Sequence, residues 1–321
     1  MRVLLTGATG FVGRRLARHL LGLGHTVAAV VRPATTPAAV QRLLAAGVRP
    51  TAEPAAALRE SDAVVHLAAA TRARSARDYR RANVDGTRAL LSAAALLDTP
   101  PTVVLCSSLA AAGPSTPARP RTESDPPAPV SDYGRSKLGA ETVVRGFADR
   151  VPAVVVRPPV VYGPGDPAFL PSLAAMVRAG VGVRPAGGAA LCLIHVDDLC
   201  AALTLAMTEG RRVDPYDSLP GVYHVCDGTP RSWPEVGRHL ARALGRPAPL
   251  LVPLPRAALM AAATLAETAA GPLGREPLLN RDKARELSQA SWTCASDRAR
   301  DELGFAPERT LLHREFRAAL R

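Results

Sequence analysis

The chain has 321 residues, of which 47% are hydrophobic and 21% are charged, a balance typical of a folded globular protein rather than a disordered or fibrous one. The formal net charge is +12, but basic residues occur in every segment and only 4% of residues are aromatic, which argues against a nucleic-acid partner. Arginine outnumbers lysine 38 to 2, which indicates a compositional bias of the source, while the charge still favours anionic cofactors or substrates.

The start of the chain and its cysteines bear on its compartment. Residues 1–10 contain no apolar run of the length that a secretory signal needs, and the longest apolar stretch, 257–266, is well short of the ~20 residues of a spanning helix. We therefore expect a cytoplasmic protein without a membrane span. The cysteines form no CxxC pair, so we expect reduced thiols that pack as small apolar residues, and no metal site. They are Cys106, Cys192, Cys200, Cys226 and Cys294.

The first 32 residues predict a strand, a glycine turn, a helix and a second strand. The strands are residues 2–6 (RVLLT) and 26–32 (TVAAVVR). Between them, leucines share one helical face: Leu16, Leu20 and Leu23. Glycines at three-residue intervals separate the first strand from this helix: Gly7, Gly10 and Gly13. In this context the glycine turn predicts a backbone that approaches a pyrophosphate held at the helix N-terminus.

The tip of the second strand bears on the choice of dinucleotide. Sites for NAD usually have a carboxylate there that binds the adenosine ribose, whereas this chain has Val31, Arg32 and Pro33. A guanidinium can pair with a 2′-phosphate and stack on adenine. We therefore expect NADP with Arg32 at its phosphate, with NAD as the less favoured cofactor; a merely solvated Arg32 is the alternative.

Further strands follow at regular spacing: 63–67, 102–106, 153–156 and 222–225. Most are continuous apolar runs, which is typical of strands that are covered on both faces. Helices are predicted between them at 78–97 and 134–149. The expected fold is therefore α/β, a Rossmann-type doubly wound parallel sheet, whose ligands bind at the carboxyl ends of the strands.

The composition of the sequence changes after residue 157, where proline and glycine become frequent. We expect a dinucleotide-binding Rossmann domain of residues 1–157, to which 191–226 returns. Residues 158–190 and 227–321 would form a smaller substrate-binding lobe, with the Ala-rich helix near 257–267 as an apolar lid.

A tyrosine and one of the two lysines lie one helical turn apart. An ammonium near a phenol lowers the pKa of the phenol, and it can also hold ribose hydroxyls, so Tyr133 could exchange a proton while Lys137 supports it. Ser108 follows the strand 102–106 and could orient a substrate oxygen. A pair of serines at a strand end is more often a cap or turn, so this motif gains weight only from the others.

These motifs together resemble the extended short-chain dehydrogenases/reductases, the NAD-dependent epimerase/dehydratase family. SSLAAAGP, residues 107–114, is more similar to the 3β-hydroxysteroid dehydrogenase and dihydroflavonol reductase branches. The matching segments run from the first strand to ELGFAP, residues 302–307, near the end of the chain: Thr6–Gly13, Asp62–Ala69, Asn83–Thr87, Ser108, Tyr133 with Lys137, Arg157–Asp166, and His195–Leu199.

The resemblance implies catalytic roles for Ser108, Tyr133 and Lys137, with Asn83 supporting the proton path, and it implies a homodimer. It gives no metal ligands, so His66 and His195 are expected to be core or hydrogen-bonding residues. The residues expected at the cofactor are Thr6, Gly7, Gly10, Phe11, Val12, Gly13, Arg32, Leu67, Ala68, Ala69, Tyr133, Lys137 and Pro158.

Three departures from the family pattern concern the ligands. An Asp-Leu pair that usually holds adenine is absent from residues 47–58, which leaves Glu53 or backbone groups. Val160 stands where nucleotide-sugar enzymes often have asparagine, and Leu109 and Ala110 stand where sugar dehydratases have Asp-Glu. The last two departures count against a nucleotide sugar.

We therefore expect an NADP-dependent oxidoreductase that interconverts a ketone or aldehyde and an alcohol, and a small, apolar substrate. The alternatives are a nucleotide-sugar epimerase with tightly held NAD and a non-catalytic NADP-binding regulator. An arginine cluster after the strand 63–67 could receive an anionic group of the substrate, although a solvated face is the favoured interpretation. Its members are Arg72, Arg74, Arg77, Arg80 and Arg81.

Overall fold

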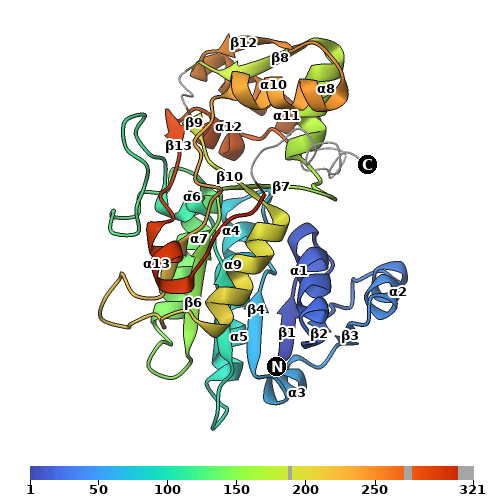
Figure 1. Cartoon of the computed structure of the whole chain (residues 1–321), viewed down its shortest axis with the longest axis vertical. Coiled ribbons are helices and arrows are strands. Elements are labelled where there is room, and N and C mark those ends of the chain that lie inside the picture. The colour runs from blue at the N-terminus through green and yellow to red at the C-terminus, as the bar shows by residue number, and fades with distance from the viewer. Residues whose placement is uncertain (187–189, 271–276, 310–321) are drawn as a thin grey trace.

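The computed structural model describes residues 1–186, 190–270 and 277–309 (Figure 1). At its centre lies a seven-stranded sheet in which all neighbouring strands are parallel. The strand order is β11 (Val222–His224), β6 (Ala153–Arg157), β5 (Thr102–Cys106), β4 (Ala63–His66), β1 (Arg2–Thr6), β2 (Thr26–Val30) and β3 (Arg49–Thr51). From β1, the next two strands, β2 and β3, extend the sheet to one edge, and the later strands β4, β5, β6 and β11 extend it to the other. This order confirms the Rossmann-type doubly wound sheet.

Helices cover both faces of the sheet because the strands are apolar on both sides. Val3 and Leu5 of β1 face one core cluster, and Leu4 between them faces another. The first face is covered by α1 (Phe11–Gly22), α2 (Pro37–Ala45), α9 (Val196–Thr208) and α13 (Asp297–Leu303). The second is covered by α3 (Pro54–Arg59), α5 (Gly86–Ala94) and α7 (Asp132–Arg145).

Three predicted helix details are corrected by the structure. Helix α1 ends at Gly22, so Leu23 is its C-cap and is 55% exposed instead of sharing the buried face. The predicted helix 78–97 is divided into α4 (Ala76–Tyr79), a π-helix η1 (Arg80–Asp85) and α5. The predicted helix 134–149 is α7, which begins at Asp132 and ends at Arg145, earlier than predicted at both ends. It begins earlier because the hydroxyl of Ser131 caps it by accepting from the amide of Gly134 at 2.9 Å.

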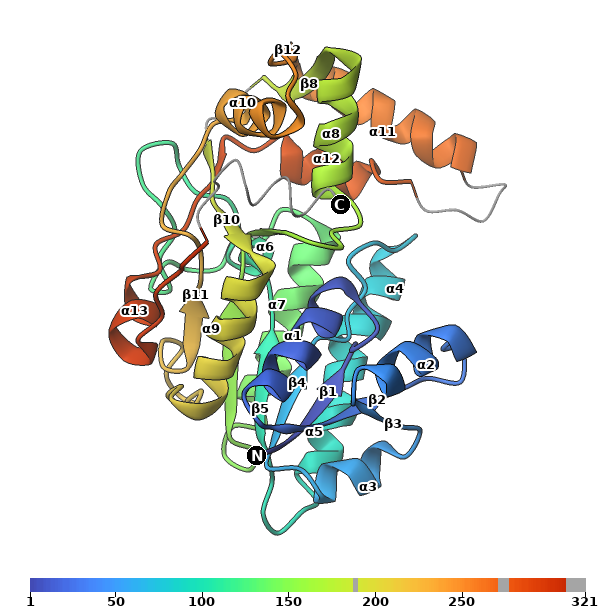
Figure 2. The same cartoon turned by 45° about the vertical axis from the view of Figure 1, so that its right-hand side comes forward.

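A second group of elements lies beyond the carboxyl ends of the sheet strands, as Figures 1 and 2 show. Three parallel pairs belong to it: β7 (Val160–Tyr162) with β10 (Leu193–His195), β8 (Val181–Pro185) with β12 (Leu250–Leu254), and β9 (Ala190–Leu191) with β13 (Ser291–Trp292). Its helices are α8 (Phe169–Ala179), α10 (Trp233–Leu244), α11 (Arg256–Ala270) and α12 (Arg281–Leu287). A separate apolar cluster joins α8 to α10.

The assignment of this second group to substrate binding stays a prediction. Residues 187–189, 271–276 and 310–321 of the expected lobe lie outside the described residues. Among the helices that are described, none has the length and apolar character to cross a membrane.

Candidate active site

The glycine turn after β1 is built by close backbone approaches. Gly7 has φ +73°, and a Cβ added to it would lie 2.8 Å from the amide nitrogen of Ala68. A Cβ on Gly13 would lie 2.2 Å from the carbonyl oxygen of Gly7. The first glycine therefore serves the tight turn, and the third lets α1 pack against the turn.

Gly10 differs from its two neighbours in the motif. It is the N-cap of α1, with no side-chain hydrogen bond to the helix. Among the described residues other than its chain neighbours, a Cβ there would come within 4 Å only of the carbonyl oxygen of Gly7, at 3.2 Å. The backbone at Gly10 is thus open to a ligand. On the same side lie the first amides of α1, which no N-cap side chain accepts from. This arrangement fits the pyrophosphate of a dinucleotide.

A chain of buried hydrogen bonds begins behind this turn. The Thr6 hydroxyl accepts from the amide of Ala68 at 3.1 Å and lies 2.7 Å from Nδ1 of His66. Nε2 of His66 lies 3.1 Å from the hydroxyl of Thr87, which donates to the carbonyl of Asn83 at 2.6 Å. These directions place the ring proton on Nε2. Burial lowers the pKa of His66 to about 3, with the nearby charge of Lys137 adding to the effect, so the ring is neutral, as a hydrogen-bonding histidine should be.

Asn83, within the π-helix η1, ties this chain to the helix of Tyr133. Its Oδ1 accepts from the amide of Ala70 at 2.7 Å, and its Nδ2 donates to the carbonyl of Ala70 at 3.0 Å and to the hydroxyl of Ser136 at 2.8 Å. Ser136 in turn donates to the carbonyl of Tyr133 at 2.7 Å. In these contacts Asn83 is a positioning residue; its expected part in a proton path stays a prediction.

Ser108 and Tyr133 meet at the carboxyl end of β5. Ser108 is the N-cap of the short helix α6 (Leu109–Ala112), and its hydroxyl accepts from the amide of Ala110 at 3.1 Å. Burial is the main influence on Tyr133 and raises the pKa of its phenol, the hydrogen bond with Ser108 lowers that pKa, and the charge of Glu286 raises it further. The pKa remains above its ordinary value, so at neutral pH the phenol carries its proton.

Lys137 is buried at the carboxyl end of β5. It is 3% exposed, and its Nζ donates to the carbonyl oxygen of Cys106 at 2.6 Å. A buried ammonium needs an acceptor, and the last carbonyl of β5 supplies it. Burial lowers the pKa of this ammonium. The expected acidification of the Tyr133 phenol by Lys137 stays a prediction.

The other residues expected at the cofactor share one edge of the sheet. Thr6, Phe11 and Val12 lie where β1 ends and α1 begins, and Leu67, Ala68 and Ala69 follow β4. Pro158 follows β6, and its carbonyl accepts from the amide of Leu109 at 2.8 Å. Arg32 follows β2 with an exposed side chain, and its amide donates to the hydroxyl of Thr35 at 3.0 Å. The carboxyl edge thus brings the predicted set together, while their contacts with a cofactor stay a prediction.

Two residues of α12 hold the N-terminus of the helix that carries Tyr133. Oδ1 of Asp282 accepts from the amide of Asp132 at 2.6 Å, and Oδ2 accepts from the amide of Tyr133 at 3.0 Å. Glu286 accepts from the hydroxyl of Ser131 at 2.7 Å. Sequence reasoning missed both carboxylates, because about 150 residues separate them from α7 and no local pattern marks them.

A buried ion pair fixes the other end of α7. The guanidinium of Arg157 donates to both carboxylate oxygens of Glu141, at 2.9 and 2.6 Å, and each side chain is 5% exposed. Ser107 also donates to Glu141. The helical spacing of Lys137 and Glu141, four residues apart on one buried face, could have drawn attention to this carboxylate. Bidentate pairing of this kind fixes the relative orientation of the two side chains and also strengthens their interaction.

A charged cavity of about 210 Å³ lies at the start of α7, where Asp132 lines it. The Tyr79 ring, which lies 5.9 Å from the ring of Tyr133, is on its wall. The lining also includes Arg74, Asp132, Glu267, Arg281, Asp282 and Arg285. Helix α11 buries Leu259 and Ala263 against α12 and turns Glu267 to the cavity, and the apolar lid expected near 257–267 stays a prediction. Of the arginine cluster, only Arg74 is on this wall, and all five members are exposed.

Known proteins resemble this chain along most of its length. The NAD dependent epimerase/dehydratase family matches residues 3–226. Ceramide reductase from Caulobacter vibrioides is 30% identical over 299 residues, which cover 92% of this chain and 86% of that protein. The 4-hydroxy-2-methyl-3-oxo-4-farnesyl-3,4-dihydroquinoline-1-oxide ketoreductase from Stigmatella aurantiaca is 33% identical over 329 residues, 90% and 92% of the two chains. A solved structure of MoeE5 in complex with UDP-glucuronic acid and NAD is 26% identical, with a TM-score of 0.74 and coverage of 99% of this chain and 97% of that one.

A doubly wound sheet with a pyrophosphate-binding turn at its carboxyl edge, next to a serine, a tyrosine and a lysine, defines an NAD(P)-dependent enzyme. The match to the family extends over most of that sheet. The chain belongs to the NAD-dependent epimerase/dehydratase family of extended short-chain dehydrogenases/reductases, and it is an NAD(P)-dependent oxidoreductase or epimerase.

Proposed function

We propose that the protein is an NADP-dependent reductase that interconverts a ketone or aldehyde and an alcohol. The observation that supports this most directly is the protonated phenol of Tyr133, hydrogen-bonded to Ser108 at the sheet edge where the glycine turn opens. A neutral phenol is a general acid, which is the form that carbonyl reduction requires.

The residues of the chain have separate tasks in this reaction. When bound, the nicotinamide supplies or removes a hydride. The hydroxyls of Ser108 and Tyr133 donate to the substrate oxygen and hold the carbonyl in one orientation. Tyr133 then transfers its proton to that oxygen as negative charge develops there, and the phenolate regains a proton from solvent. Lys137 would exchange its contact with the Cys106 carbonyl for the hydroxyls of the nicotinamide ribose and stabilise the phenolate.

The substrate we propose has a polar group near the carbonyl and an apolar remainder. By name, two relatives act on a ceramide and on a farnesyl-bearing quinoline oxide, which both combine these features. Arg74, Arg281 and Arg285, which line the cavity at the start of α7, offer donors to the polar part. This refines the expectation of an apolar substrate.

A nucleotide-sugar epimerase is the second candidate, because MoeE5 binds UDP-glucuronic acid and NAD and shares the whole fold. Val160, Leu109 and Ala110 argue against it, since they replace polar residues that sugar-nucleotide enzymes often have. Cofactor consumption separates the two: a reductase oxidises NADPH in proportion to product, whereas an epimerase retains its NAD and needs no reductant.

Substitution of Tyr133 by phenylalanine tests the proposed acid. We expect Tyr133→Phe to lower the rate of NADPH oxidation, with a panel of polar-headed ketones, by roughly 10²- to 10⁴-fold. NADPH binding, measured by its fluorescence, should stay within a few-fold. Tyr216→Phe is the matched control, because Tyr216 is 97% exposed and should keep full activity. If Tyr133→Phe keeps the activity of the unaltered protein, the protein is not the reductase proposed; a non-catalytic NADP-binding regulator would also be insensitive to this change.

A further inference from the structure

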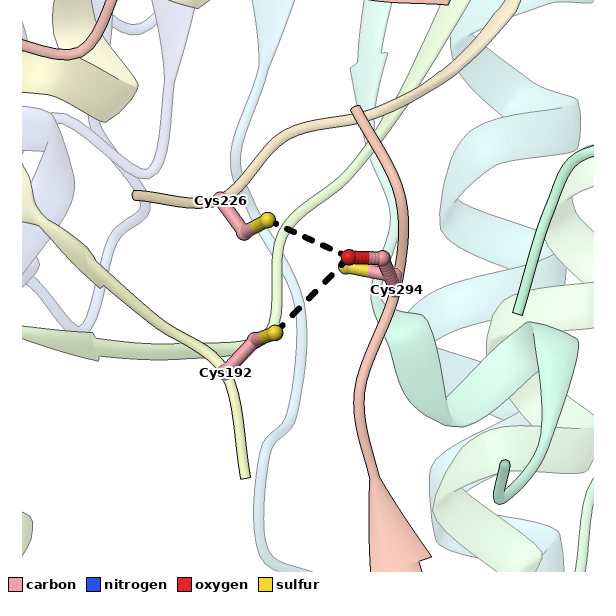
Figure 3. Close-up of side chains that lie close together, drawn as sticks. All are labelled: Cys192, Cys226 and Cys294. Carbon is pink, nitrogen blue, oxygen red and sulfur yellow. Dashed lines mark hydrogen bonds between the residues drawn. The ribbon is translucent and has the colours of Figure 1, made fainter. Parts of the chain in front are cut away.

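Three of the five cysteines, far apart in the sequence, meet inside the protein. Cys192 lies between β9 and β10, Cys226 follows β11, and Cys294 follows β13. Their sulfur atoms all lie within 4.8 Å of one another, and the residues are at most 4% exposed. Figure 3 shows the three side chains converging from separate segments. We call these residues the cysteine triad.

The triad has few other polar atoms around it. The thiols of Cys192 and Cys226 donate to the carbonyl oxygen of Cys294 at 3.7 and 3.3 Å (Figure 3). Sγ of Cys226 also lies 3.7 Å from the hydroxyl of Ser296. Leu109 and Ala112 of α6 pack against the triad, with Trp292 of β13 beside them, and the backbone of Gly228 hydrogen-bonds to Cys226. Among the described residues, the oxygens in contact with the sulfurs belong to the segment 294–296.

This arrangement matches the ligand chemistry of a thiophilic cation. A zinc–sulfur bond of about 2.3 Å places sulfurs around a tetrahedral ion about 3.8 Å apart, so thiols within 4.8 Å of one another need only small side-chain shifts to close on one. Thiolate ligands exclude Mg²⁺ and Ca²⁺, which bind oxygen. The carbonyl of Cys294 and the hydroxyl of Ser296 are the oxygens placed for a fourth position.

Charge favours a divalent ion over Cu(I) in this pocket. Three thiolates together carry a charge of −3. A divalent ion would reduce the net charge of the site to −1, whereas a monovalent ion would leave it at −2. An uncompensated charge is costly among apolar side chains.

We propose that Cys192, Cys226 and Cys294 form a structural zinc site. The ion would fasten three chain segments to one another: the link between β9 and β10, the end of the sheet strand β11, and the C-terminal strand β13. It would also support α6, whose first turn is capped by Ser108. The site is separate from the cofactor site and holds whether or not the proposed reductase activity is correct.

Metal analysis of the full-length protein tests the proposal. After exposure to Zn(II) and gel filtration, we expect about one zinc per chain in the unaltered protein and in Cys200→Ala, and a loss of that zinc in Cys226→Ala. Cys200 is a matched control, because it is equally buried but lies in α9, outside the triad. Chelation should lower the melting temperature of the first two proteins by several degrees and leave that of Cys226→Ala unchanged.

A second measurement needs no substitution, so a variant that fails to fold does not end the test. Cd(II) added to the metal-free protein should produce thiolate-to-metal charge-transfer absorption that saturates at one equivalent and is reversed by excess chelator. The proposal is overturned if neither ion binds, if Cys226→Ala folds and retains the zinc, or if only Cu(I) binds. A disulfide within the triad, seen by mass in protein purified without reductant, would overturn it as well.

Discussion

At the scale of single residues, the environment of Tyr133 decides its chemistry more than the residue type does. A phenol normally has a pKa near 10, and burial together with the charge of Glu286 moves it upward, against the hydrogen bond from Ser108. The structure therefore holds Tyr133 as a proton donor. Alcohol oxidation needs the opposite form, the phenolate, and so should respond to any group that shifts this pKa.

Glu286→Gln removes one negative charge that faces Tyr133 while keeping an oxygen that can accept from Ser131. Because that charge raises the pKa of the phenol, its removal lowers the pKa. We expect the pH profile of alcohol oxidation to shift toward lower pH, with little change in the rate of carbonyl reduction at neutral pH. A profile that does not move, or that moves toward higher pH, would show that Glu286 does not act on Tyr133 by charge.

Arg32→Ala tests the cofactor preference. A guanidinium that pairs with the 2′-phosphate contributes roughly a 10- to 100-fold gain in affinity, so we expect the Kd for NADPH to rise by that factor and the Kd for NADH to change little. Arg42→Ala is the control, because Arg42 is also exposed, on the neighbouring helix α2. An equal loss for both dinucleotides would contradict a 2′-phosphate contact.

At the scale of elements, the short helix α12 completes α7. Helix α7 begins at Asp132, and its first amides need acceptors. Ser131 supplies one and Asp282 supplies two. One of the two lysines, Lys283, also acts here, because its Nζ donates to Glu286 at 2.8 Å. The placement of Tyr133 thus depends on a segment of the second lobe.

Asp282→Ala should therefore destabilise the protein and disturb the active site together. Loss of a helix cap costs about 1–2 kcal/mol, which urea denaturation can measure as a lower midpoint at unchanged slope. We also expect a lower kcat, because the end of α7 that carries Tyr133 loses two acceptors. Asp98→Ala, an exposed carboxylate beyond α5, should change neither quantity. Equal stability of the two variants would show that the cap contributes nothing.

At the scale of the whole molecule, two buried histidines link stability to pH. Burial lowers the pKa of His66 and of His224 from 6.5 to about 3, while both return to ordinary values on unfolding. The unfolded chain therefore binds more protons between these values. The stabilisation is complete above about pH 6.5 and is lost as the pH falls toward 3.

Each histidine should contribute a slope of up to about 1.4 kcal/mol per pH unit in this window. Urea denaturation between pH 7 and 5.5 should show that the free energy of unfolding decreases as the pH is lowered, in a range where most carboxylates do not yet titrate. His66→Gln and His224→Gln should each reduce the slope, even where they lower stability at pH 7.

Sequence by itself determined the features that depend on neighbours along the chain. Apolar runs identified six of the seven strands of the sheet, and missed the edge strand β3, whose sequence RPT has no apolar run. The glycine spacing after β1 identified the turn that fits a pyrophosphate. One helical turn between Tyr133 and Lys137 placed them on one helix. These predictions needed only local periodicity and the rule that ligands bind at the carboxyl edge, so they located the candidate site before any tertiary contact was known.

Only the tertiary structure decided what distant segments do to that site. It placed Lys137 on a backbone carbonyl, Asp282 and Glu286 against α7, and charged side chains around the cavity at the start of α7. It also brought together Cys192, Cys226 and Cys294, whose spacing of 34 and 68 residues matches no ligand motif. The reason is that strand and helix patterns repeat over a few residues, whereas the convergence of separate segments depends on how the whole sheet and lobe pack.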